Sequence, residues 1–139
     1  MVKNLSDVNW CLKKAEEYLE SAKDNIQKER LYPAAEEIFK CVETLLEALL
    51  YFYGVKKIEY PGRIKKFSGR LALQFLIRDV LVKGGKIEKG IYEKYLTLAS
   101  ELHFASYRKG KYFEKEELKR YLDFAKELLI KVKYIVKFS

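Results

Sequence analysis

The sequence predicts an all-α protein, an up-and-down bundle of four long helices plus one shorter or central helix. Three observations predict this fold class. Apolar residues recur at spacings of three and four, no sustained period-two alternation occurs, and Gly and Pro are confined to a few breaks. With 49% apolar residues, the 139-residue chain can bury a core without metal or disulfide support. We therefore expect one helical domain over residues 1–139.

The first two predicted helices are bounded by capping residues. The first covers about 6–29, where Ser6 and Asp7 are candidate N-terminal caps. The second starts at Pro33, because the missing N–H of proline is not needed in the first helical turn. Gly54 is positioned to end this helix as a C-terminal cap.

Three further helices are predicted in the second part of the chain. The segment 66–83 is apolar on nearly all sides, which predicts a central helix. The segment 87–108 has a core face of Ile91, Tyr95, Leu98 and Leu102. The segment 114–137 starts with an acidic first turn that complements the helix dipole.

No membrane association is expected. The most apolar run, 71–82, is too short to span a bilayer, and Arg78 and Asp79 interrupt it. The first ten residues contain no apolar stretch of the kind found in signal peptides. We therefore expect a cytoplasmic protein.

The two cysteines are not expected to form a disulfide. If the first two helices are antiparallel, Cys11 and Cys41 differ in height by roughly 12 Å, whereas a disulfide requires Cα atoms within about 7 Å. Two cysteines and one histidine at wide spacing also do not match a zinc site. The sequence therefore predicts no metal and no cofactor.

The positive charge is concentrated in the second part of the chain. Residues 1–53 carry 7 basic and 10 acidic side chains, a net charge of −3, and residues 54–139 carry 21 and 10, a net charge of +11. In an alternating bundle, the loops after the second and fourth helices lie at one end, so their basic residues are predicted to converge. Phosphates contacted by Lys and Arg, with bases stacked on aromatic rings, would give an RNA or nucleotide site. Its candidate residues are Arg63, Lys65, Lys66, Arg70, Tyr107, Arg108, Lys109 and Lys111. The alternative is that these charges only keep the loops soluble.

Two segments resemble a known family. "AAEEIFKCVETLLEALLYFYGV" (34–55) is similar to the second helix of HEPN domains, small helical bundles named for nucleotide binding in higher eukaryotes and prokaryotes. "ASELHFASYRKGKYFEKEELKRYLDFAKELL" (99–129) resembles the last helices of that family. Its Leu102, His103 and Tyr107 match the archaeal PaREP repeat-element branch. The resemblance implies a helical bundle, a homodimer, and a nucleotide, RNA or nucleotidyltransferase partner.

His103, the only histidine, is the candidate catalytic residue. Ribonuclease members of the HEPN superfamily place an Arg upstream of the histidine with four to six residues between them. The corresponding positions here are Leu98, Thr97 and Leu96. The ribonuclease function is therefore an alternative hypothesis, with His103 as base and Arg108 or Arg70 stabilising the phosphate.

A helical wheel places His103 about 120° from the centre of the core face, on a semi-apolar flank. That flank is the predicted homodimer interface and comprises Leu96, Ser100, His103, Phe104 and Tyr107. His103 has three possible roles: a structural residue at this interface, a ligand-binding donor beside Tyr107 and Arg108, or a general base.

The leading functional hypothesis is a homodimeric HEPN-like protein that binds nucleotide or RNA through a basic end. The first alternative is a metal-independent, toxin-type ribonuclease that uses His103. The second alternative is a non-catalytic interaction module that partners a nucleotidyltransferase chain. Enzyme activity is left open by the sequence.

Overall fold

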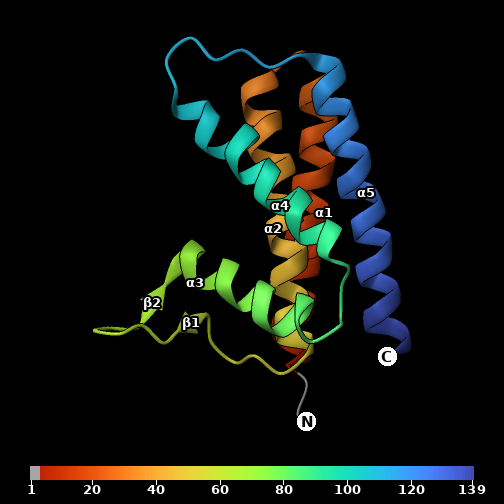
Figure 1. Cartoon of the computed structure of the whole chain (residues 1–139). Coiled ribbons are helices and arrows are strands. Elements are labelled where there is room, and N and C mark those ends of the chain that lie inside the picture. The colour runs from red at the N-terminus through yellow and green to blue at the C-terminus, as the bar shows by residue number, and fades with distance from the viewer. Residues whose placement is uncertain (1–3) are drawn as a thin grey trace.

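The computed structural model describes residues 4–139 and is dominated by helices, as predicted (Figure 1). Residues 1–3 of the predicted domain lie outside the described part. The elements in chain order are α1 (Leu5–Gln27), α2 (Leu31–Phe52), β1 (Glu59–Tyr60), β2 (Phe67–Ser68), α3 (Gly69–Leu76), η1 (Ile77–Val82), α4 (Lys89–Leu98), η2 (Ala99–Phe104), η3 (Ala105–Tyr107) and α5 (Lys115–Phe138). The long helices α1, α2 and α5 run side by side, and α3 and α4 cross them on one side (Figure 1).

Helix α2 is the centre of the fold. Its buried residues occur on every side of the helix and include Ile38, Phe39, Leu45 and Leu49, which are fully inaccessible. We expected the segment 66–83 to be central, but Leu71 is 45% exposed. The apolar residues of that segment pack partly against a β-hairpin, which explains why it is apolar without being enclosed by helices.

The hairpin is formed by β1, which lies before the predicted helix 66–83, and by β2, which replaces the start of that predicted helix. Tyr60 pairs with Phe67 in an antiparallel register, and both rings contact Phe75 of α3, with centroids 5.0 and 5.9 Å away. The Tyr60 hydroxyl also donates a hydrogen bond to Asp79 of η1. Strands of two residues are too short to give a period-two signal, so these tertiary contacts define the hairpin.

Two helices contain a π-helical turn that the sequence pattern did not reveal. The predicted helix 66–83 becomes π-helical at Ile77–Val82, and the predicted helix 87–108 does so at Ala99–Phe104. In a π turn the hydrogen bonds join residues five apart, so residues at that spacing lie on nearly the same face. The faces assigned with an α-helical wheel therefore shift in both segments.

The ends of the other helices lie within a few residues of their predicted positions. The predicted caps Ser6 and Asp7 are wrong, because both lie inside α1 and the N-cap is Asn4, whose side chain accepts from the Asp7 N–H. Gly54 follows α2 with a φ of 100°, the left-handed conformation expected of a C-terminal cap. Helix α2 starts two residues before Pro33, which therefore lies within its first turn. Cys11 and Cys41 are both free and buried, as predicted, and burial raises the pKa of each thiol to about 12. Across residues 4–139, no helix combines the length and apolarity needed to cross a bilayer.

Candidate functional site: an arginine–histidine pair on two glutamates

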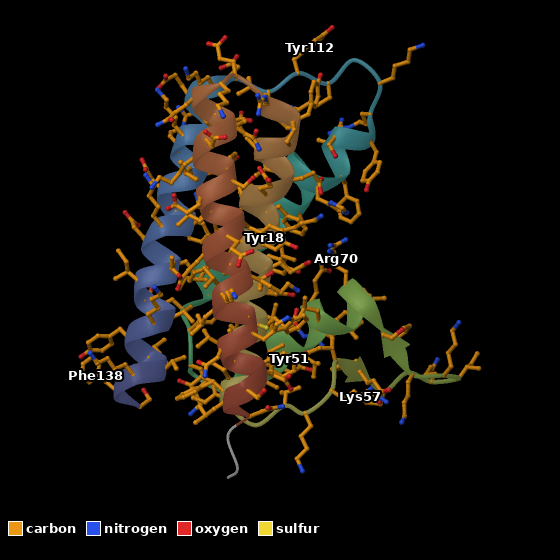
Figure 2. All side chains as sticks on the ribbon, turned by 180° about the vertical axis from the view of Figure 1, so that it is seen from behind. Tyr18, Tyr51, Lys57, Arg70, Tyr112 and Phe138 are labelled. Atoms are coloured by element: carbon orange, nitrogen blue, oxygen red, sulfur yellow. The ribbon has the colours of Figure 1, made fainter. Side chains whose placement is uncertain are left out.

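The structure brings His103 of η2 against Arg70 of α3, over the surface of α2. Arg70 Nη1 lies 2.9 Å from His103 Nε2. On the other side of the ring, His103 Nδ1 lies 3.0 and 3.1 Å from the two carboxylate oxygens of Glu36. Figure 2 shows Arg70 on the side of the bundle where α3 and the hairpin lie. An imidazole is therefore held between a cation and an anion.

The π turn explains why His103 faces α2. Leu98 is fully buried on α2, and His103 follows it by five residues, the spacing that a π turn aligns. The side chain of His103 is only 11% exposed. The predicted orientation of His103 toward an exposed flank is thus wrong, because an α-helical wheel rotates each residue too far through this segment.

Arg70 is positioned by the turn that joins the hairpin to α3. Gly69 starts α3 with a φ of 68°, a left-handed conformation that glycine adopts at little cost. The side chain of the next residue, Arg70, extends from the first turn of α3 to Glu43 of α2. Its Nε lies 2.9 Å from Oε2 and its Nη2 lies 3.0 Å from Oε1. This bidentate arrangement leaves Nη1 directed at His103.

Phe39 provides an aromatic surface beneath the pair. It lies between Glu36 and Glu43 on one face of α2. Its ring stacks on His103 at 5.1 Å and on Tyr95 of α4 at 5.9 Å. The guanidinium of Arg70 lies over the same ring, 5.0 Å from its centroid. The position of the imidazole and the guanidinium therefore depends on a fully buried residue.

The hydrogen bonds indicate the tautomer of His103. A glutamate oxygen accepts, so Nδ1 carries the proton and donates it to Glu36. Nε2 then has a free lone pair that accepts from Arg70. The hydroxyl of Ser106 also donates to Glu36, at 3.1 Å. The carboxylate thereby orients the ring so that its second nitrogen faces the arginine.

The pair is reachable from solvent beside two aromatic rings. The Arg70 side chain is 32% exposed. Phe104 and Tyr107 are 55% and 76% exposed, and their ring centroids lie 5.1 and 5.4 Å from that of His103. The site thus offers a cation, an imidazole nitrogen and two accessible π faces, which is a chemistry suited to a phosphate with an attached base.

The other basic candidates lie in two separate places. Tyr32, at the start of α2, donates a hydrogen bond to the carbonyl of Lys111 at 2.5 Å, whereas the hairpin follows the far end of α2. A helix of 22 residues spans roughly 33 Å. Tyr112 and Lys57 mark these opposite ends in Figure 2. The predicted convergence is wrong, because α3 crosses the bundle and does not return along it.

Within these segments the cations differ in how they are paired. Lys66 lies 3.6 Å from Glu59, and Lys111 lies over the ring of Phe113. Four other cations were predicted to bind phosphate, and within residues 4–139 they contact no carboxylate. All four are exposed: Arg63, Lys65, Arg108 and Lys109. Arg70 is therefore the one predicted phosphate-binding cation that contacts His103.

The predicted dimer flank is divided by the structure. The exposed members are Leu96, Ser100, Phe104 and Tyr107. His103 is turned inward and belongs to the cluster on α2.

Sequence reasoning did not identify the four residues that contact the pair or hold it in place, which are Glu36, Phe39, Glu43 and Tyr95. A signal was present in α2, where Glu36 and Glu43 lie two turns apart on one side of a largely apolar helix. A carboxylate on a mostly buried helix requires a cation or donor from elsewhere in the chain. The partner Arg70 lies 33 residues before His103, so a search along a single helix does not find it.

Comparison with known proteins identifies the sequence family. The family model described as HEPN domain matches residues 8–135, which is nearly the whole chain. A search of curated proteins gave no match, and a search of solved structures gave none either.

Proposed function

Because this chain belongs to the HEPN family, we propose that it binds RNA or nucleotides by holding a phosphate against the partly exposed Arg70 guanidinium, beside His103. The main support for this proposal is the 2.9 Å contact between Arg70 Nη1 and His103 Nε2 at a partly exposed position. Phe104 and Tyr107 lie next to this pair and would stack against bases. The unpaired cations of the hairpin and of the 108–111 loop would add affinity that does not depend on sequence.

Removal of Arg70 tests this proposal. Arg70→Ala is expected to weaken RNA binding by about tenfold or more, because a charge-assisted hydrogen bond contributes about 1.5–3 kcal/mol. Fluorescence anisotropy with a labelled RNA at 50 mM salt measures the affinity. The matched control is Arg120→Ala on the exposed surface of α5, which removes the same charge away from the site.

The control variant is expected to change the affinity by less than about twofold. Equal losses in the two variants would mean that only net charge matters. Absence of any RNA binding by the unmodified chain at 50 mM salt would overturn the proposal. In that case, co-purification with a nucleotidyltransferase would favour the interaction-module hypothesis.

A second candidate function is metal-independent RNA cleavage, favoured by the order Glu36–His103–Arg70. His103 Nε2 would take the proton of a 2′-hydroxyl, whose oxygen then attacks the adjacent phosphorus. Arg70 would stabilise the charge that builds up on the phosphate oxygens. The 5′-oxygen leaves with a proton from solvent, and the products are a 2′,3′-cyclic phosphate and a 5′-hydroxyl. Glu36 would keep the imidazole in the required orientation.

Cleavage of a labelled RNA in EDTA tests this candidate. His103→Ala is expected to abolish the activity, and Arg70→Ala is expected to reduce it by about 10²–10³-fold, as for other transition-state donors. Mass spectrometry of the products should detect the cyclic phosphate. Cleavage that persists at the same rate in His103→Ala would exclude His103 as the base.

We also propose that the domain is a homodimer and that it belongs to the PaREP repeat-element branch. The exposed apolar side chain of Leu96, which has no role in the proposed RNA site, supports a dimer interface on this flank. Light scattering at micromolar concentration tests the dimer, and a monomer alone would contradict it.

A further inference from the structure

Arg70 is held by more than its contact with His103. Its Nε and Nη2 atoms both donate to Glu43, at 2.9 and 3.0 Å, and only Nη1 is directed at the imidazole. A free arginine side chain samples many rotamers and carries about 2 kcal/mol of conformational entropy. The carboxylate of Glu43 therefore determines which edge of the guanidinium faces the candidate phosphate position.

Glu43 is in turn held by Tyr95. The Tyr95 hydroxyl donates to Glu43 Oε2 at 2.5 Å, and the Tyr95 side chain is fully buried. Burial, followed by the nearby Glu43 charge, raises the pKa of Tyr95 well above its ordinary value. The hydroxyl consequently keeps its proton and acts as a donor throughout the working pH range.

We propose that Glu43 and Tyr95 are positioning residues, which together fix Arg70 so that Nη1 faces His103 and a bound phosphate. The inference rests on the proposed function of the Arg70–His103 pair. Neither residue touches the ligand in this arrangement. Tyr95 acts through Glu43, and Glu43 acts through Arg70, so one chain of hydrogen bonds joins α4, α2 and α3.

The proposal predicts different effects for substitutions of two tyrosines in α4, Tyr95 and Tyr92. Tyr95→Phe removes only the hydroxyl and keeps the ring that stacks on Phe39. Tyr92→Phe is the matched control, because Tyr92 is half-buried on the same helix and lies outside this hydrogen-bond chain. Thermal unfolding of both variants is measured first, so that the comparison uses folded protein.

Nuclear magnetic resonance reports the arrangement without any ligand. Arg70 Nε–H is expected to exchange slowly with water in the unmodified chain and at least about tenfold faster in Tyr95→Phe. His103 is the only histidine, so its two ring-nitrogen signals need no further assignment. We expect the Nδ1-protonated tautomer in the unmodified chain and in Tyr92→Phe, and a mixture of tautomers in Tyr95→Phe.

RNA binding gives the second readout. Tyr95→Phe and Glu43→Gln are both expected to weaken the affinity about three- to tenfold, whereas Tyr92→Phe changes it by less than about twofold. Glu43→Gln keeps the shape of the side chain and one acceptor oxygen, so it tests the same chain of bonds if Tyr95→Phe folds poorly.

The outcomes separate this inference from the proposed function. The positioning role would be overturned if folded Tyr95→Phe and Glu43→Gln kept the Arg70 exchange rate, the His103 tautomer and the RNA affinity of the unmodified chain. In that case, RNA binding by the unmodified chain would still support the proposed function. Altered exchange and tautomer in a chain that binds no RNA would support the positioning of Arg70 and would contradict the proposed function.

Discussion

The His103→Gln variant is expected to bind RNA about tenfold or more weakly than the unmodified chain, because a hydrogen bond to a charged group contributes about 1.5–3 kcal/mol. His103 accepts from Arg70 Nη1 and is itself held by Glu36, so the imidazole keeps the guanidinium in one orientation. Glutamine retains hydrogen-bonding capacity, but it lacks the ring that stacks on Phe39.

The groups that face His103 are Glu36 from α2 and Arg70 from α3, and Glu43 and Tyr95 lie behind the arginine. Loss of the imidazole therefore removes the one contact that Arg70 makes through Nη1, and its contacts with Glu43 remain.

Fluorescence anisotropy at 50 mM salt tests this expectation. Arg120→Ala, an exposed substitution outside the site, is the control. Binding by folded His103→Gln within about twofold of the unmodified chain would contradict the role of the imidazole.

The Phe39→Ala variant is expected to have a free energy of unfolding about 3–5 kcal/mol lower than the unmodified chain. Phe39 is fully buried, and its removal would leave a cavity at the centre of α2. The rings of His103 and Tyr95 and the guanidinium of Arg70 would all lose their stacking partner. The loss should therefore be at the upper part of the range for large-to-small core substitutions.

Urea denaturation followed by circular dichroism measures this difference. Phe104→Ala is a matched control, because it removes the same ring from a position that is 55% exposed. Its cost is expected to be below about 1 kcal/mol. A Phe39→Ala variant within 1 kcal/mol of the unmodified chain would show that the stack contributes little to stability.

The long helices were predictable because their signals are local. Apolar spacing and a few Gly and Pro residues are properties of neighbouring positions, so α1, α2 and α5 lie within a few residues of their predicted bounds. The crossing of α3 was not predictable in this way. It depends on the contacts of Phe75 with Tyr60 and Phe67, which come from a hairpin too short to be recognised in a sequence.

The candidate site was predictable only in part. His103 and Arg70 were both identified as candidates, since a lone histidine and a basic segment are visible in the sequence. Their pairing is a tertiary fact, and it requires Arg70 to come from a different helix. The inward rotation of His103 required a π turn, and an apolar pattern read with a period of 3.6 residues does not reveal one.

Because of the π turn Ala99–Phe104, the direction in which His103 points depends on the number of residues in this segment as well as on their identity. A π turn accommodates one residue more than an α-helical turn, so a deletion of a single residue here would restore regular α-helix. A deletion between Leu98 and His103 would shorten their spacing to four, which a regular α-helix aligns, so His103 would still face α2. A regular helix that kept every residue would instead rotate the imidazole by about 100° away from Glu36 and Arg70. In an alignment of related chains, a one-residue gap just before the histidine would therefore be compatible with the cluster, because the missing residue and the π turn disappear together.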